Sequence, residues 1–186
     1  LAHILEKRRH FNNLTERKLK STMEIDEEEL SSNLEILFQT ENRIAEIIKK
    51  SGLRFSTNKM TAELGEFYAF QTLSRKIGLF ESIEPQRNSN AEFDLLGKLA
   101  PNSILFEHFE KKEIRIEVKT RRNQEGVKYL SSLKPEKFEL LCVVDMAKNY
   151  TLNRIYLVES ERADKSLDRI RHRLIFNEKM AFMTID

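Results

Sequence analysis

The chain has only one cysteine, three prolines, five glycines and no tryptophan among its 186 residues. The single cysteine, Cys142, excludes an internal disulfide and is typical of a reducing compartment. So few prolines and glycines argue against long flexible linkers. No apolar run reaches the roughly 18 residues that a membrane-spanning helix needs, and the basic N-terminal region lacks the apolar stretch of a signal peptide. We therefore expect a cytoplasmic protein that does not enter a membrane.

Charge is unevenly distributed along the chain, although the net charge is only +2. Residues 1–20 contain six basic and two acidic side chains, whereas residues 21–50 contain three basic and eight acidic ones. A basic segment attracts nucleic acid, while an acidic one suits solvent or a protein partner. The reversal favours a region with one face for DNA and another for a protein, although solvated helix faces give the same pattern.

Hydrophobic spacing divides the chain into two parts. Residues 1–56 carry apolar side chains at helical intervals, with a second helix start suggested at 31–33 and a stop at Ser51-Gly52. We predict two or three helices there, forming an N-terminal arm or subdomain. In residues 57–186 the pattern predicts a helix at 60–78, strands at 91–99, 112–120, 140–144 and 154–159, a short helix within 127–138 and a basic C-terminal helix at 160–173. This order predicts an α/β fold with a mixed central sheet flanked by helices.

Two neighbouring predicted strands carry the residues that could take part in catalysis or metal binding. Apolar and charged residues alternate along 112–120, so Glu117 and Lys119 emerge on the same face. Asp94 lies on the preceding predicted strand, 23 positions before Glu117. If the two strands pair antiparallel, Asp94 comes beside Glu117. Adjacent carboxylates repel each other and are stabilised by a cation, and hard oxygen ligands with room for water suit Mg²⁺.

Such a carboxylate pair with a nearby lysine suits the hydrolysis of a phosphodiester. A metal held by Asp94 and Glu117 acidifies a water molecule and neutralises charge on the phosphate. Lys119 is placed to hold the attacking water and to stabilise the charge that develops. The chain shows no Ser/His or Cys/His arrangement for nucleophilic catalysis, and this mechanism needs none.

A family resemblance rests on the same residues. Gly65-Glu66 on an amphipathic helix, Asp94 on a strand and Glu117-x-Lys119 on the next strand resemble, in that order, the motifs of the PD-(D/E)XK nuclease superfamily. The resemblance implies a restriction-endonuclease-like core with Asp94 and Glu117 as metal ligands and Lys119 as the catalytic lysine. It also implies that Glu66 joins the metal ligands, and that the cofactor is Mg²⁺, for which Mn²⁺ can substitute.

The resemblance covers about residues 60–160 and shows one departure from the family pattern. Phe93 precedes Asp94 where the motif has proline. The helix carboxylate also has an alternative, because Glu63 lies close to one helical turn before Glu66.

Basic residues indicate double-stranded DNA as the substrate. Arg121 and Arg122 directly follow the strand that carries Lys119, and Arg169 and Arg173 lie on the predicted C-terminal helix. Arginines at such places make phosphate contacts, which add salt-dependent affinity without sequence information.

A core of about one hundred residues leaves little of the chain for reading a DNA sequence. A helical arm before such a core resembles the small subunit of a heterodimeric type IIS restriction endonuclease. That resemblance implies a chain that is monomeric when isolated and cuts one strand, while a larger subunit recognises the site and nicks the other. The alternatives are a stand-alone homodimeric type II or repair nuclease and, without catalysis, a nuclease-fold DNA-binding module.

Overall fold

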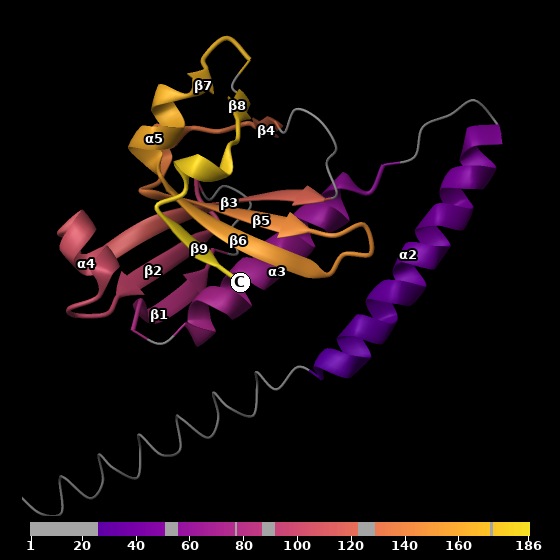
Figure 1. The fold of residues 1–186 in the computed structure, drawn as a ribbon, viewed down its shortest axis with the longest axis horizontal. Coiled ribbons are helices and arrows are strands. Elements are labelled where there is room, and N and C mark those ends of the chain that lie inside the picture. The colour runs from indigo at the N-terminus through magenta and orange to yellow at the C-terminus, as the bar shows by residue number, and fades with distance from the viewer. Residues whose placement is uncertain (1–25, 51–55, 77, 87–91, 123–128, 172) are drawn as a thin grey trace, which may run out of the picture.

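The computed structural model describes residues 26–50, 56–76, 78–86, 92–122, 129–171 and 173–186. They fold around a six-stranded sheet with the order β1-β2-β3-β5-β6-β9 (Figure 1). Its strands are β1 (Phe80–Pro85), β2 (Leu95–Leu99), β3 (Glu113–Arg122), β5 (Leu140–Met146), β6 (Leu152–Glu159) and β9 (Met183–Ile185). β3 and β5 are parallel and all other neighbours are antiparallel, which makes the sheet mixed. The predicted α/β class with a mixed central sheet and flanking helices is confirmed.

Different elements cover the two faces of this sheet. Helix α3 (Asn58–Arg75) packs on one face, where β3 contributes Ile114, Ile116 and Val118 to the core. The opposite face is covered by the short helix α5 (Ser160–Lys165) and by a second sheet of three strands, β4 (Tyr129–Ser131), β8 (Arg173–Ile175) and β7 (Leu167–Asp168). Both faces of β5 are therefore buried, as the uninterrupted apolar run at 140–144 predicts.

The remaining short elements connect or extend the sheet. Helix α4 (Ile104–Phe109) joins β2 to β3, and its first turn is capped by the Ser103 hydroxyl, which accepts from the Phe106 N–H at 3.0 Å. Two 3₁₀ turns, η1 (Pro135–Lys137) and η2 (Glu178–Met180), precede β5 and β9.

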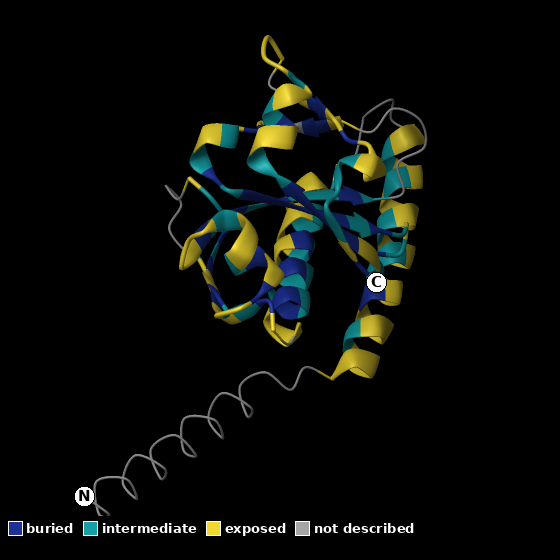
Figure 2. Cartoon of the chain, turned by 60° about the vertical axis from the view of Figure 1, so that its left-hand side comes forward, coloured by how far each residue is buried: buried dark blue, intermediate teal, exposed yellow. Residues whose placement is uncertain are grey.

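Helix α2 (Glu27–Lys50) lies beside this core and is mainly exposed (Figure 2). Asp26 begins the helix, because its carboxylate accepts from the N–H groups of Glu28 and Glu29 at 3.0 Å each. The helix runs through 31–33 without interruption, so the second start predicted there is wrong. Its described part reaches Lys50, whereas residues 1–25 and 51–55 of the predicted arm, including the stop predicted at Ser51-Gly52, lie outside the described residues.

Three predicted elements differ from the structure. The predicted C-terminal helix at 160–173 ends at Lys165, and the chain turns into the β7–β8 hairpin because Leu167 and Leu174 pair across it and Leu174 is buried. The segment 127–138 forms β4 and η1 rather than a single short helix, since β4 pairs with β8. The strand predicted at 91–99 begins only at Leu95, so Asp94 precedes it. Among the described residues, no helix is long and apolar enough to cross a membrane.

Candidate active site

Asp94 is fixed at the start of β2, directly before the residue that pairs with β3. Leu95 lies opposite Ile116 in the antiparallel register. The Asp94 N–H donates to the Ile116 carbonyl at 3.0 Å, and one Asp94 carboxylate oxygen accepts from the Val118 N–H at 2.7 Å. These two bonds to residues on either side of Glu117 place Asp94 beside it, as the sequence predicts for antiparallel strands.

Glu117 and Lys119 form a partly buried ion pair on β3. The Lys119 Nζ lies 2.5 Å from Glu117 Oε1, and the side chains are 24% and 13% exposed. Both lie on the face opposite α3, because the alternate residues Ile116 and Val118 point into the core beneath that helix. The pair stays reachable from solvent while it is shielded enough for electrostatic interactions to be strong.

The two carboxyl groups are held in a place that disfavours their charge. Burial raises the pKa of Asp94, although the hydrogen bond from Val118 and the charge of Lys119 oppose the shift. Burial also raises the pKa of Glu117, with Asp94 adding to the shift and Lys119 opposing it. The lysines Lys119 and Lys134 offset only part of these shifts, so a cation that favours the charged carboxylates would stabilise this site.

Gly65 brings α3 close to β3. A Cβ atom at position 65 would lie 1.7 Å from the hydroxyl oxygen of Thr120, so only glycine permits this approach. The next residue, Glu66, has a raised pKa, caused by burial and then by repulsion from Asp94 and Glu63.

Glu66 and Glu63 are distinguished by their surroundings. The charges that act on Glu66 include Asp94, Lys119 and Glu117, which places it at the edge of the acidic pair. Glu63 is 64% exposed and lies 3.7 Å from Lys59 on its own helix. The arrangement favours Glu66 as the helix carboxylate.

Asp94 and Glu117 offer two carboxylate groups to a metal ion such as Mg²⁺. Within the described part of the chain, no group of three or more His, Cys, Asp and Glu side chains lies close enough to hold a metal ion, so Glu66 does not complete a three-residue site with Asp94 and Glu117. Mg²⁺ needs no such cage, because one or two carboxylates typically bind it together with water and substrate phosphates. Two partly buried carboxylates that supply charged oxygen ligands fit Mg²⁺.

Arg121 is not a surface phosphate contact, contrary to the sequence-based expectation. Its side chain is 1% exposed, and it pairs with Asp145 at 2.6 Å and with Glu178 at 3.2 Å. Its guanidinium also lies over the rings of Tyr156 and Phe176, 5.3 and 4.9 Å from their centroids. Side chains alternate between the two faces of β3, so Arg121 lies on the same face as Lys119. There Arg121 is buried in the second core, the apolar cluster between the large sheet and the three-stranded sheet, which includes Tyr156 and Phe176.

Arg122 also has protein partners rather than a free surface. It donates two hydrogen bonds to the Glu41 carboxylate, at 2.7 and 2.9 Å, and lies 4.2 Å from the centroid of the Tyr150 ring. The Tyr150 hydroxyl donates to the same carboxylate at 2.6 Å. Arg122 therefore joins β3 to α2, and the expected DNA contact does not fit its position.

The remaining predicted DNA-binding residues are exposed, but not on a helix. Arg169 lies in the β7–β8 turn with its side chain 76% exposed, and Arg173 is exposed on β8. Sequence reasoning missed Lys134, an exposed residue before η1 whose charge opposes the rise in the pKa of Glu117. Its place before a buried strand parallel to β3 is the signal that could have identified it.

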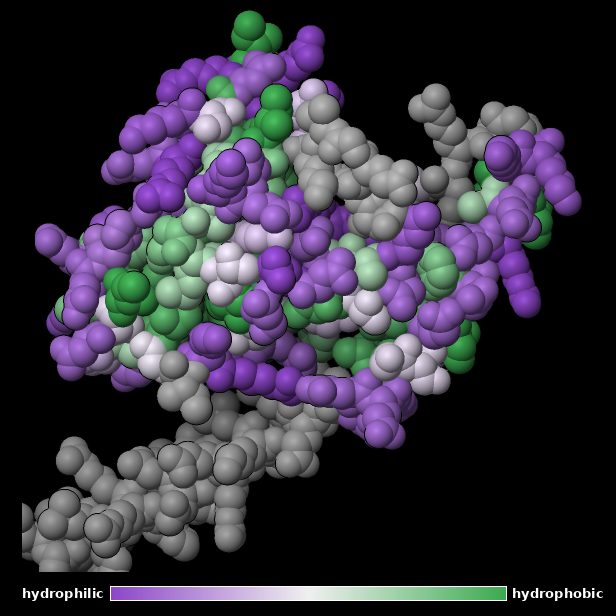
Figure 3. Space-filling view, in the orientation of Figure 1, coloured by the Kyte–Doolittle hydropathy of each residue, from purple (hydrophilic) through white to green (hydrophobic). Residues whose placement is uncertain are grey.

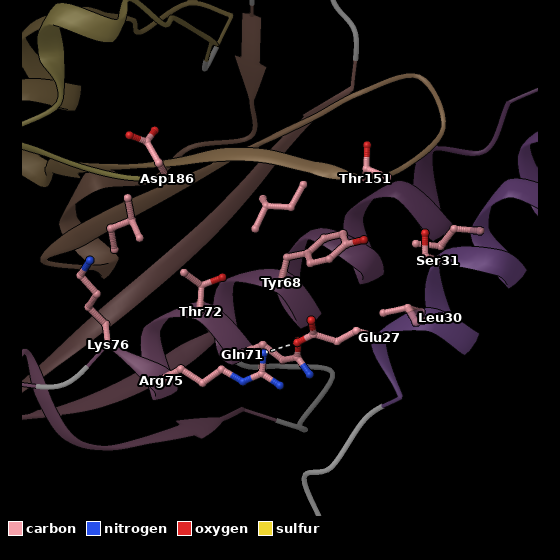
Figure 4. Close-up of a pocket in the computed structure, with 13 residues that line it drawn as sticks. Glu27, Leu30, Ser31, Tyr68, Gln71, Thr72, Arg75, Lys76, Thr151 and Asp186 are labelled. Carbon is pink, nitrogen blue, oxygen red and sulfur yellow. Dashed lines mark hydrogen bonds and ion pairs between the residues drawn. The ribbon is translucent and has the colours of Figure 1, made fainter.

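A separate cavity of about 470 Å³ lies between α2, α3 and the β6–β9 edge (Figure 4). The Arg75–Glu27 ion pair, at 2.7 Å, joins the two helices along it. Gln71 also lines it, and its side-chain nitrogen is buried and has no hydrogen-bond partner among the described residues. None of its lining residues is Asp94, Glu117 or Lys119, so the cavity is separate from that group.

The chain shows a weak similarity to a solved structure. No family model matches the chain, and no curated protein matches it by sequence. Among solved structures, the bacterial homing endonuclease I-Ssp6803I is similar with a TM-score of 0.39 and 11% sequence identity, over 57% of this chain and 71% of that one. A similarity of this size carries no functional conclusion.

Proposed function

We propose that this protein is a Mg²⁺-dependent endonuclease that hydrolyses phosphodiester bonds in double-stranded DNA. The observation that supports it most is the hydrogen bond from Val118 that holds the Asp94 carboxylate beside the Glu117–Lys119 pair. Carboxylates at these two places, with a lysine two residues after the second, resemble the PD-(D/E)XK motif, and this resemblance supports the proposal. Their raised pKa values fit a centre that requires a cation.

Each residue has a separate role in this proposal. Asp94 and Glu117 would hold Mg²⁺, with Mn²⁺ as a substitute, and Glu66 adds negative charge at the same edge. The bound metal supplies an acidified water and neutralises charge on the phosphate. Lys119 orients the attacking water and donates to the phosphate oxygens as their charge grows. Lys134, the second cation near Glu117, contacts the DNA backbone.

The finer proposal is that the chain is the small subunit of a heterodimeric type IIS restriction enzyme and cuts one strand. Nearly all described residues belong to the core or to α2, which leaves no separate base-reading domain in the described part of the chain. The exposed side of α2 combines glutamates with Ile36 and Ile47, which are 61% and 65% exposed. Such a mixed surface suits a larger recognition subunit.

Plasmid cleavage tests both levels of the proposal. The purified chain is incubated with supercoiled DNA and Mg²⁺, alone and with the product of a neighbouring reading frame as candidate large subunit. We expect little cleavage alone, because a monomer with non-specific affinity of roughly 10⁻⁴–10⁻⁶ M seldom occupies a site. With the partner, a defined site should be cut, since tethering raises the effective concentration to the millimolar range.

The other outcomes identify the alternatives. A homodimer that cuts a defined site by itself would replace the subunit proposal with a stand-alone type II or repair nuclease. Duplex binding without cleavage, under every metal and partner condition, would instead indicate a DNA-binding module.

A further inference from the structure

The tip of the β7–β8 hairpin exposes a large apolar side chain between two arginines. Ile170 is 93% exposed, more than any other large hydrophobic residue that the structure describes. Arg169 and Arg171 flank it, with side chains 76% and 69% exposed. Hairpin loops usually favour Gly, Asn, Asp or Ser, so local folding does not explain a β-branched residue at this place.

Hydrogen bonds within the turn and a buried leucine behind it fix the position of the hairpin tip. The Asp168 carboxylate accepts from the N–H groups of Ile170 and Arg171, at 3.1 and 3.2 Å, which shapes the described part of the turn. Behind the turn, Leu167 pairs with Leu174, and Leu174 is fully buried in the second core. Ile170 is therefore exposed at the end of a hairpin whose strand β8 is attached to the protein by the buried Leu174.

Charge around the tip favours a polyanion over an apolar partner. Residues 160–173 contain five lysines and arginines against three acidic residues. Arg169 pairs with Asp164 at 2.8 Å and Arg171 lies 4.0 Å from Asp168, but both pairs are exposed and hence weak. Phosphates can replace these partners. Figure 3 shows the same end of the molecule as mainly hydrophilic, with separate hydrophobic spots over β7 and β8.

The hairpin stands on the same face of the large sheet as the proposed catalytic pair. Glu117 lies opposite Leu141 and Lys119 opposite Val143 in the parallel β3–β5 register. Leu141 and Val143 belong to the core cluster that also contains Leu174 of β8. A duplex that reaches Lys119 therefore approaches the side of the sheet from which the hairpin projects (Figure 1).

We propose that the β7–β8 hairpin is a minor-groove DNA-binding element, in which Ile170 inserts as a wedge between base pairs while Arg169 and Arg171 contact the groove and its phosphates. Apolar wedges flanked by basic residues are a known way to bind and bend a duplex through the minor groove. This assignment rests on the proposed function in one respect, namely that DNA is the ligand.

The wedge is tested with duplexes that carry 2-aminopurine at successive positions, because unstacking of this base raises its fluorescence. Binding is measured at low salt without divalent metal, so that no cleavage occurs. We expect the wild-type chain to raise the fluorescence at one or more steps. Ile170→Ala should abolish that rise and weaken duplex binding about tenfold. Ile104→Ala on α4, which removes another exposed isoleucine, should change neither.

The arginines are tested through salt dependence. Arg169→Gln combined with Arg171→Gln should reduce the slope of log affinity against log salt by about 1.8, the value for two lost phosphate contacts. Because all three side chains are exposed, we expect unchanged melting temperatures, and a melting scan of each variant confirms that folding is intact.

Each further outcome separates this inference from the proposed function. Wild-type fluorescence and affinity in Ile170→Ala, with Mg²⁺-dependent cleavage intact, would overturn the wedge and leave the nuclease proposal standing. A normal fluorescence response in a chain that never cleaves DNA would overturn the nuclease proposal alone. If Ile170→Ala changes only self-association in light scattering, the hairpin is a protein contact and the wedge is refuted.

Discussion

The N–H of Val118 donates to the carboxylate of Asp94 at 2.7 Å, so a side chain at the start of β2 satisfies a backbone donor of β3. A buried N–H without a partner is costly, which makes this hydrogen bond a structural requirement as well as a means of positioning. Asp94 therefore has two roles, one that needs only an acceptor oxygen and one that needs the negative charge. Substitutions can separate them.

Asp94→Asn should abolish Mg²⁺-dependent cleavage while the fold is retained. The amide oxygen can still accept from Val118, but the charge that binds the cation is lost. Because burial raises the pKa of Asp94, ionised Asp94 opposes folding at neutral pH, so the melting temperature without metal should hold or rise slightly. Asp94→Ala should lose cleavage and also about 1–3 kcal/mol of stability, because Val118 is left unpaired.

Glu81→Gln is the matched control for these variants, since Glu81 forms an exposed ion pair with Lys98 on the β1–β2 surface. It should cleave and melt as wild type. Plasmid cleavage and thermal melting measure both effects. Cleavage by Asp94→Asn at the wild-type rate would remove Asp94 from the active site.

Lys119→Ala should slow the chemical step by roughly 2.7–4 kcal/mol, the scale for loss of one preorganised donor to the transition state. DNA affinity should change little, because a single phosphate contact among several is removed. Single-turnover cleavage and fluorescence anisotropy measure the two quantities separately. Loss of binding with an unchanged single-turnover rate would make Lys119 a docking residue.

The alternation in 112–120 was sufficient to predict where Glu117 and Lys119 point. A strand has a strict period of two, and Ile114, Ile116 and Val118 define the buried face. Asp94 was also identified correctly as its neighbour, because antiparallel pairing of consecutive strands is a local property. These predictions depended on short-range regularities.

The burial and pairing of Arg121 and Arg122 depend on partners that are far away in the sequence. Their positions directly after Lys119 and Thr120 predict exposure, yet Arg121 pairs with Glu178 and Arg122 with Glu41, each more than fifty positions away in the sequence. The spacing of hydrophobic residues indicates local structure and does not predict such distant ion pairs. The helix predicted at 160–173 ends early, at Lys165, for a similar reason, because the burial of Leu174 against the large sheet overrides local helical preference in the second half of that segment.

Gly65→Ala should destabilise the protein by about 1–3 kcal/mol, the scale for overpacking. The new Cβ would meet the Thr120 hydroxyl at 1.7 Å and push α3 away from β3. Glu66 should move with the helix, so cleavage should also fall. Thr120→Ala in the same chain removes the closest atom and should restore part of both losses. Denaturant melts of the single and double variants measure this coupling, and additive effects would show that helix and strand adjust independently.

Glu139 should contribute stability that disappears in acid. Burial opposes its ionisation, but hydrogen bonds from Arg115 and Lys111 outweigh that effect and lower its pKa to about 2 from an ordinary value of 4.5. A lowered pKa means that the stabilisation is complete above about pH 4.5 and is lost as the pH falls toward 2. After allowance for solvent around the pair, roughly 1–2 kcal/mol is expected.

The Glu139 contribution is measured as a difference between wild type and Glu139→Gln. Their unfolding free energies should differ most near pH 6 and converge as the pH approaches 2. Glu136→Gln, an exposed neighbour, should show no such convergence. A constant difference across this range would mean that Glu139 acts through packing rather than through its charge.

Arg122, at the end of β3, could either anchor helix α2 or contact a DNA phosphate, and the two roles predict different effects of substitution. Its two hydrogen bonds to Glu41 and its contact with the Tyr150 ring predict a structural anchor. Arg122→Gln should therefore lower stability by about 1.5–3 kcal/mol, the range for hydrogen bonds to charged groups, and should leave the salt slope of duplex binding unchanged. Glu41→Gln should lower stability as well, since it weakens the same pair from the other side.

Hydrogen exchange locates the effect of these Arg122 and Glu41 variants. Loss of the anchor should speed exchange along α2 more than along β5, because β5 is buried on both faces while Leu34 is the one buried residue that the structure describes on α2. A phosphate contact would behave differently. If Arg122→Gln melted as wild type while its salt slope fell by about 0.9, the arginine would exchange Glu41 for a DNA phosphate on binding, and the anchor assignment would be refuted.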